Sequence, residues 1–119
     1  MRKLFALFLI VCLACSKPLP ELEGIDTKQW KDDPKACKNM RAQFLEALRT
    51  ERPKLKGLSE MDLVKLIGKP DRNDLSARHE KFYYYFIEPS ADCEGGKESA
   101  LKLIVRFNAV GLSREVAIE

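Results

Sequence analysis

The residues of this chain that could do chemistry are one histidine, four cysteines and a few adjacent carboxylates. His79 lies among charged residues, and no nearby residue has the spacing of a Ser-His-Asp arrangement, so we expect a solvated loop histidine. The segment 92–94 (Asp-Cys-Glu) could bind a metal ion together with His79, but no Cys-x-x-Cys or His-x-x-x-His pair lies near it. A Gly-x-Gly-x-x-Gly or phosphate-binding loop does not occur. The sequence therefore predicts a protein that is not an enzyme and that has no metal ion or cofactor.

The length and net charge of the chain further limit the class of protein that it can be. The 119 residues suffice for one domain, and a content of 45% hydrophobic and 33% charged residues is ordinary for a globular fold. The formal net charge is +3, but Arg2 and Lys3 belong to a leader, and without them 19 basic residues face 18 acidic ones. A balance that small argues against nucleic acid as the partner.

Residues 1–14 have the pattern of a lipoprotein signal peptide. Arg2 and Lys3 precede an apolar run over residues 4–13, which as a helix would span about 15 Å, half of a bilayer core of about 30 Å. A run this short is typical of a cleaved export signal. The segment Cys-Leu-Ala-Cys that ends at Cys15 resembles a lipobox, so we expect cleavage directly before Cys15 and its acylation. The alternative is ordinary secretion with Cys15 as an unmodified thiol.

The remaining chain divides into a tether and one domain. Residues 15–31 begin with a proline-rich stretch that lacks periodicity, so we expect a lipidated cysteine followed by a flexible tether. Trp30 could anchor the end of this tether on the domain or lie exposed as a binding residue. The domain covers residues 32–119. Its two cysteines, Cys37 and Cys93, are expected to form a disulfide, because the other two cysteines belong to the leader and the lipid anchor.

Two helices are predicted ahead of the strands. Ser59 is a good N-cap and Gly68 is a stop signal, and the apolar face between them predicts a helix over residues 60–67. Asp33, followed by a proline, is a start signal for a longer helix. Apolar residues at helical spacing extend this second helix over residues 34–50.

Three strands are predicted in the second half of the chain. The aromatic run 82–87 and the alternating segment 101–107 read as strands, residues 108–111 as a hairpin turn, and residues 112–118 as the returning strand. The polar segment 71–81 reads as a loop. Helices followed by antiparallel strands indicate an α+β fold, with two N-terminal helices packed on one face of a three- to four-stranded antiparallel sheet.

The other face of this sheet is the candidate binding surface. We expect the even-numbered aromatic residues of the run 82–87 to face the helices. The residues left on the open face are Tyr83, Tyr85, Ile87 and Ile104. An aromatic and aliphatic patch with polar edges is typical of protein interfaces. The alternative is that the last strand, the loop after the aromatic run or the tryptophan covers this face.

Two segments resemble a known family. Residues 57–70 have the pattern Gly-apolar-Ser-x-x-x-apolar-x-x-Leu-apolar-Gly-x-Pro, and residues 105–112 have the pattern apolar-x-Phe-Asn-x-x-Gly-apolar. In this order they are similar to the helix-turn core and the closing hairpin of the SmpA/OmlA (BamE-like) outer-membrane lipoproteins, over residues 54–119. The Tyr-x-x-Asp-Ile-x-Gln-Gly-like segment that precedes the first helix of that family is not matched by residues 30–34. The resemblance therefore supports a prediction of the fold more strongly than a prediction of the binding partner.

The residues and the resemblance together predict a non-enzymatic, membrane-anchored lipoprotein of the bacterial envelope that binds another protein. The resemblance implies a role in outer-membrane protein assembly or envelope maintenance. We expect a lipid anchor in the outer membrane, a domain that faces the periplasm, and neither nucleic acid nor a small-molecule substrate as partner. The alternative is an inhibitor-like or ligand-binding periplasmic module, because the β-lactamase-inhibitor proteins look like tandem copies of a similar helix-sheet unit. A structural envelope protein without a discrete partner is a third hypothesis.

Overall fold

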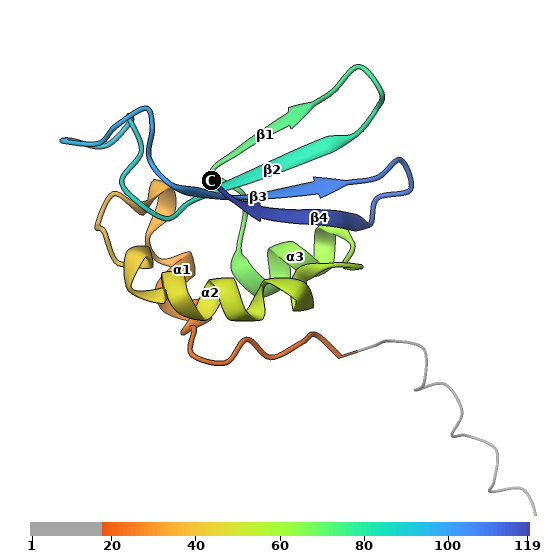
Figure 1. The fold of residues 1–119 in the computed structure, drawn as a ribbon, viewed down its shortest axis with the longest axis horizontal. Coiled ribbons are helices and arrows are strands. Elements are labelled where there is room, and N and C mark those ends of the chain that lie inside the picture. Colours follow the sequence, from red (N-terminus) through yellow and green to blue (C-terminus); the bar gives the residue numbers. More distant parts are fainter. Residues whose placement is uncertain (1–17) are drawn as a thin grey trace, which may run out of the picture.

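The computed structural model describes residues 18–119, so the expected signal peptide (residues 1–14) and the expected lipidation site Cys15 lie outside the described residues. Three α-helices precede four strands along the chain (Figure 1). The helices are α1 (Thr27–Lys31), α2 (Leu45–Glu51) and α3 (Glu60–Ile67). The strands are β1 (Arg72–Leu75), β2 (Lys81–Phe86), β3 (Lys102–Phe107) and β4 (Ser113–Ile118). The predicted α+β class is confirmed.

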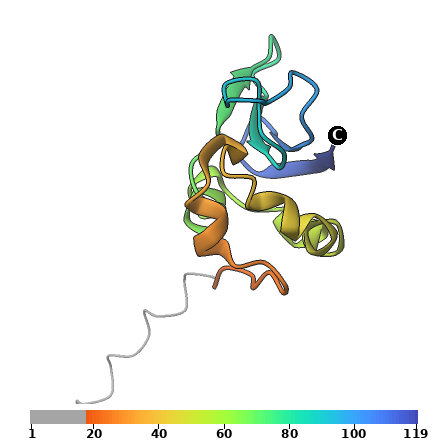
Figure 2. The ribbon, with the colours of Figure 1, turned by 90° about the vertical axis from the view of Figure 1, so that its left-hand side faces the viewer.

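The four strands form one antiparallel sheet in the order β1-β2-β3-β4. The helices lie on one side of this sheet (Figures 1 and 2). On the other side, Phe86 at the end of β2 is buried with Ala36 and with Ala100 of the loop 88–100. Strand β1 falls inside the segment 71–81 that the sequence predicts as a loop. All four of its residues are exposed, so it has no apolar alternation from which a strand could be predicted. Its place in the sheet comes from pairing with β2, where Arg72 is opposite Tyr84.

The predicted helix over residues 60–67 is confirmed as α3. The Ser59 hydroxyl accepts a hydrogen bond from the backbone N–H of Asp62 at 3.1 Å, which is the N-cap contact that the sequence predicts. Gly68 ends the helix with φ at +90°, a conformation that favours glycine. The predicted hairpin turn is also confirmed, since the Asn108 side chain accepts from the N–H groups of Val110 and Leu112.

The predicted continuous helix over residues 34–50 is wrong in its first half. Its start is a short 3₁₀ turn, η3 (Pro34–Ala36), in which Lys35 and Ala36 have positive φ. Helical structure resumes only in η4 (Arg41–Phe44) and then runs through α2 into η5 (Arg52–Leu55). The carboxylate of Asp33 makes no cap bond to η3. It accepts instead from the backbone N–H groups of Lys38, Met40 and Arg41. These bonds fold residues 34–40 into a loop before helical structure resumes at η4.

The predicted flexible tether over residues 15–31 is wrong for its second half. Leu22, Ile25 and Trp30 are buried in the main core, each with at most 8% of its surface exposed. Helix α1 is capped by Asp26, whose side chain accepts from two backbone N–H groups. The folded domain therefore begins before residue 32, and the lone tryptophan is a packing residue.

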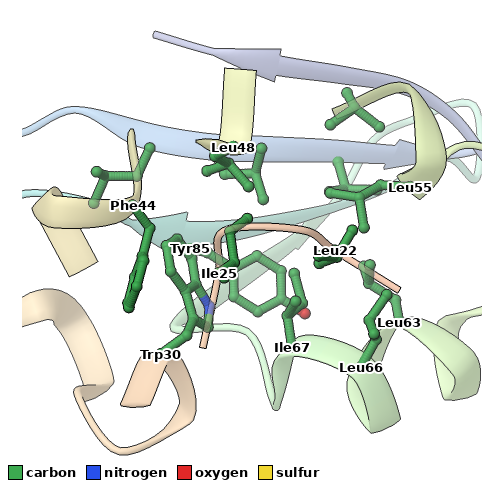
Figure 3. Close-up of a cluster of buried hydrophobic side chains, with 14 of the residues drawn as sticks. Leu22, Ile25, Trp30, Phe44, Leu48, Leu55, Leu63, Leu66, Ile67 and Tyr85 are labelled. Carbon is green, nitrogen blue, oxygen red and sulfur yellow. The ribbon is translucent and has the colours of Figure 1, made fainter. Parts of the chain in front are cut away.

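The core fills the space between the helix layer and the inner face of the sheet (Figure 3). From β3 it receives Leu103, Val105 and Phe107, all fully buried, which confirms the alternation predicted for this strand. The helical segments contribute Leu48, Leu55, Leu63 and Ile67. Burial of a large apolar side chain is worth about 1.5–3 kcal/mol, so this layer supplies the main driving force for folding.

Candidate functional site

Strand β2 has the opposite sidedness to the one that the sequence predicts. Tyr85 and Ile87 are fully buried in the main core, and Tyr83 packs against it. Of the four residues expected on the open face, only Ile104 lies there, opposite Tyr84 in the pairing of β2 with β3. The expectation for Tyr83, Tyr85 and Ile87 is therefore corrected.

Two hydroxyl groups explain why the tyrosines face inward. The phenol of Tyr85 donates to the carbonyl oxygen of Gly68 at 2.9 Å, and the phenol of Tyr83 donates to Glu60 Oε1 at 2.7 Å. Both acceptors belong to α3 or its cap, so each ring is buried while its polar tip is satisfied. Burial, reinforced by the hydrogen bond to Glu60, raises the pKa of Tyr83 to about 12. Burial also raises the pKa of Tyr85.

The open face of the sheet is an apolar strip across three strands. It consists of partly buried side chains that are opposite or diagonal to one another in the register of β2, β3 and β4: Phe82, Tyr84, Ile104 and Ala117. A hollow of about 230 Å³ lies over them. All four side chains keep part of their surface exposed, whereas Phe86 at the end of the same face is buried with Ala36 and Ala100. We call these four residues the open-face strip.

Charged side chains of both signs surround the open-face strip. Arg106 pairs with Glu80 at 2.8 Å and with Glu115 at 3.0 Å, and the bond to Glu115 is the main reason why the pKa of Arg106 is raised. On the other side, the Arg72 guanidinium lies 5.6 Å from the centre of the Tyr84 ring, within cation–π range. These edge charges therefore interact mainly with neighbouring residues of the same face, and the apolar side chains of the strip lie between them.

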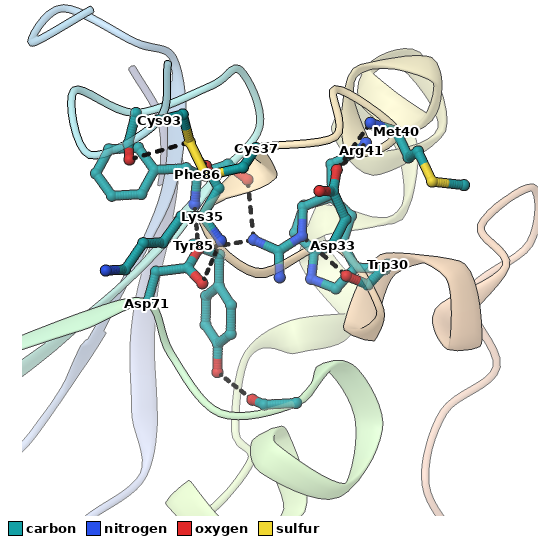
Figure 4. Close-up of polar contacts among 12 residues, drawn as sticks. Trp30, Asp33, Lys35, Cys37, Met40, Arg41, Asp71, Tyr85, Phe86 and Cys93 are labelled. Atoms are coloured by element: carbon teal, nitrogen blue, oxygen red, sulfur yellow. Dashed lines mark hydrogen bonds and ion pairs between the residues drawn. A yellow bond between two sulfur atoms is a disulfide. The ribbon is translucent and has the colours of Figure 1, made fainter. Parts of the chain in front are cut away.

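A second polar centre is buried between the helix layer and β2. Arg41 and Asp71 form an ion pair at 2.7 Å, with 2% and 3% of the respective side chains exposed (Figure 4). Asp71 also accepts from the backbone N–H groups of Lys35 and Phe86. The Arg41 guanidinium donates to the carbonyl oxygens of Trp30 and Phe86 and lies 4.7 Å from the Trp30 ring centre. This centre ties the loop 34–40, the α3–β1 connection and β2 together.

The disulfide between Cys37 and Cys93, predicted from the cysteine count, is confirmed. It joins the loop 34–40 to the loop 88–100 next to the Arg41 centre (Figure 4). The second loop is closed by a bridge between Ser90 and Lys97. A Cβ atom on Gly96 would lie 1.7 Å from the carbonyl oxygen of Ser90, so only glycine permits this approach of the backbone.

The remaining residues that could do chemistry are dispersed. His79 is exposed in the turn between β1 and β2, where it has a positive φ. Over residues 18–119, no three side chains of the His, Cys, Asp and Glu types come together as a metal site would require. The same residues contain no helix with the length and apolar content needed to cross a bilayer.

Comparisons with family models, with curated proteins and with solved structures gave no match. The resemblance to the SmpA/OmlA lipoproteins therefore stays a prediction from two short motifs. Arg41 and Asp71 were missed by the sequence reading because they are 30 residues apart and neither belongs to a motif. The sequence gives one indication that the predicted inner and outer faces of β2 could be exchanged, which is that the aromatic run has apolar side chains on both faces.

Proposed function

We propose that this protein is a non-enzymatic lipoprotein of the bacterial envelope that binds another protein through the open-face strip. The proposal includes an acylated Cys15 as the membrane anchor and a domain whose helices cover one face of the sheet. The observation that carries it is the partly exposed strip of Phe82, Tyr84, Ile104 and Ala117. Aromatic residues enclosed by a polar edge are the usual composition of the energetic centre of a protein interface.

The charges around the strip favour a protein as the occupant. Nucleic acid binds to surfaces with excess positive charge, whereas Arg106 is already paired with two glutamates. A folded protein or peptide surface offers both apolar contacts for the strip and exchangeable partners for the charges at its edge. We therefore commit to a protein partner with an apolar contact surface and charges of both signs.

The path of the first described residues supports an open face turned away from the membrane. Leu19 packs against the core. Three residues lie between it and Cys15, so four chain steps allow the two residues to be at most about 14 Å apart. The segment 18–25 runs along the helix layer on the side opposite the sheet in both views (Figures 1 and 2). With Cys15 in the bilayer, the helices lie nearest the membrane and the strip is accessible to proteins in the periplasm.

The proposed biological role follows the resemblance and is the assembly of outer-membrane proteins or the maintenance of the envelope. A location in the outer membrane with the domain in the periplasm belongs to the same proposal. Protein binding is supported by the strand register, which places the strip residues on one face of the sheet. The role in assembly or envelope maintenance is supported by the order of the two motifs over residues 54–119.

Site-specific photocrosslinking in the native host tests the proposal. A photoreactive phenylalanine analogue replaces Tyr84 or Ile104 on the strip, and Met61 serves as the matched control, because it is 67% exposed on α3 on the helix side. We expect one defined product from positions 84 and 104 and none from position 61. A component of the β-barrel assembly machinery as the captured species would support the family role, and an envelope enzyme would support the inhibitor-like alternative. Equal labelling from all three positions, or none, would refute binding through the strip.

A further inference from the structure

The buried Arg41 guanidinium has one nitrogen that the fold does not use. Its Nε donates to the Trp30 carbonyl oxygen, and its Nη1 donates to Asp71 and to the Phe86 carbonyl oxygen. No hydrogen bond to a described residue uses Nη2, and Figure 4 shows this third nitrogen without a contact. The side chain as a whole is 2% exposed, yet Nη2 keeps contact with solvent, because among residues 18–119 only Trp30 Nε1 is a fully buried side-chain donor without a partner.

A cavity of about 390 Å³ lies beside this group and includes Arg41 in its wall. This volume is at the lower end of the range for small-molecule sites, which is about 300–1,000 Å³. Pro34, Ile67 and Pro70 provide apolar wall, and Lys31, Lys35 and Lys69 stand at its edge. The cavity thus combines an apolar lining with several cationic groups.

Asp71 balances the charge of Arg41, so the net positive charge at the cavity comes from its lysines. Asp71 is the carboxylate in its wall, and both of its oxygens are occupied, by the N–H groups of Lys35 and Phe86 and by Arg41 Nη1. Lys35 pairs with Asp92, but both side chains are well exposed, so that pair is weak. Lys69 is exposed at the edge and is available to approach a bound group.

We propose that this cavity binds an oxyanion, the carboxylate or phosphate group of a small organic molecule. Arg41 Nη2 is the donor to the oxyanion, Lys69 adds charge from the edge, and the two prolines with Ile67 contact the apolar body of the ligand. A charge-assisted hydrogen bond from arginine to an oxyanion is among the stronger polar contacts in proteins. The site depends neither on the open-face strip nor on acylation of Cys15, and it departs from the expectation that the chain takes no small molecule.

Trp30 provides a reporter beside the site, in contact with Arg41. It is the only tryptophan of the chain, its ring lies 4.7 Å from the Arg41 guanidinium carbon, and its Nε1–H has no acceptor among the described residues. Its fluorescence and its single indole N–H signal in a two-dimensional NMR spectrum therefore report a new charge next to Arg41.

The test is a titration of the mature protein, purified in a non-ionic detergent, with sodium phosphate and separately with sodium acetate. Sodium chloride at the same ionic strength is the control for screening. We expect a saturable change of the Trp30 signals with phosphate or acetate that chloride does not produce. Lys69→Glu is expected to weaken binding at least about threefold, the scale of one partly exposed ion pair. Lys56→Glu, an equal change at an exposed lysine away from the cavity, is expected to leave it unchanged.

Three results would overturn the proposal. The first is the absence of a saturable signal with both oxyanions. The second is a signal that chloride reproduces at matched ionic strength. The third is an equal effect of the Lys69 and Lys56 substitutions. A lost signal in Arg41→Lys counts in favour of the site only where thermal melting shows that the variant is folded, and the two lysine variants decide the question without it.

Discussion

Asp71→Ala is expected to remove a large part of the stability of the domain. The substitution leaves the Arg41 charge buried without its partner, and breaking a buried pair in this way costs about 3–5 kcal/mol. It also deprives the backbone N–H groups of Lys35 and Phe86 of their acceptor. Single domains are stable by only about 5–15 kcal/mol, so we expect the variant to be marginally folded.

The assay is urea unfolding followed by Trp30 fluorescence, with the free energy of unfolding and its urea dependence compared between variants. Asp92→Ala is the matched control, because Asp92 pairs with Lys35 while 67% of its side chain is exposed. We expect the control to lose at most about 1 kcal/mol. Asp71→Asn keeps an acceptor oxygen but removes the charge, so its loss should fall between the two. The reasoning is refuted if Asp71→Ala and Asp92→Ala lose similar amounts.

The other predictions concern the disulfide, the two faces of β2 and the tyrosine pKa values. Replacing both Cys37 and Cys93 by Ser removes a crosslink across 56 residues and should lower the free energy of unfolding by about 4 kcal/mol. A reducing agent should have the same effect on the native protein. A loss below about 1 kcal/mol would contradict this. Tyr85→Glu buries an unpaired charge and should abolish cooperative melting in circular dichroism, whereas Tyr84→Glu on the open face should melt within a few degrees of the native protein; equal melting of the two would contradict the face assignment. Because the pKa of Tyr83 is raised to about 12 in the folded state from about 10 in the unfolded state, its contribution to stability is complete below pH 10 and is lost as the pH rises through 12. Urea unfolding between pH 9 and pH 12 should therefore show a steeper fall in stability for the native protein than for Tyr83→Phe, and identical slopes would exclude this role.

The elements that the sequence predicted correctly are those with local causes. Helix α3 has its cap at Ser59 and its stop at Gly68 within ten residues, so both signals could be recognised without knowing the fold. Strand β3 alternates fully buried and partly buried residues, as a strand with one face in the core requires. The disulfide followed from the count of cysteines, because only Cys37 and Cys93 remained to pair.

The elements that were mispredicted have causes far away in the sequence. The apolar spacing over residues 34–50 fits a helix, but the chain is bent at residues 35–39 by bonds from Asp33, by Asp71 and by the disulfide, which come from 5 to 56 residues away. The helix propensities of residues 34–50 carry no information about these contacts, so tertiary contacts override the helical pattern of the sequence.

The candidate site was mispredicted for a related reason. Both faces of β2 carry aromatic rings, so alternation alone fixes which residues share a face but leaves open which face is buried. The choice is made by acceptors on and after α3, Glu60 for Tyr83 and the Gly68 carbonyl for Tyr85. A phenol that finds such a partner is buried at little polar cost, and this reverses the simple ranking of phenylalanine over tyrosine for the core.

The most direct test of protein binding through the open-face strip is the yield of the photocrosslinked product from position 104 in cells with Tyr84 and in cells with Tyr84→Glu. A charge in the centre of the strip should exclude an apolar partner surface while the domain stays folded. The account predicts a product in the Tyr84 background that is lost in the Tyr84→Glu background, at equal protein level and equal melting temperature. An undiminished product in the Tyr84→Glu cells would contradict it.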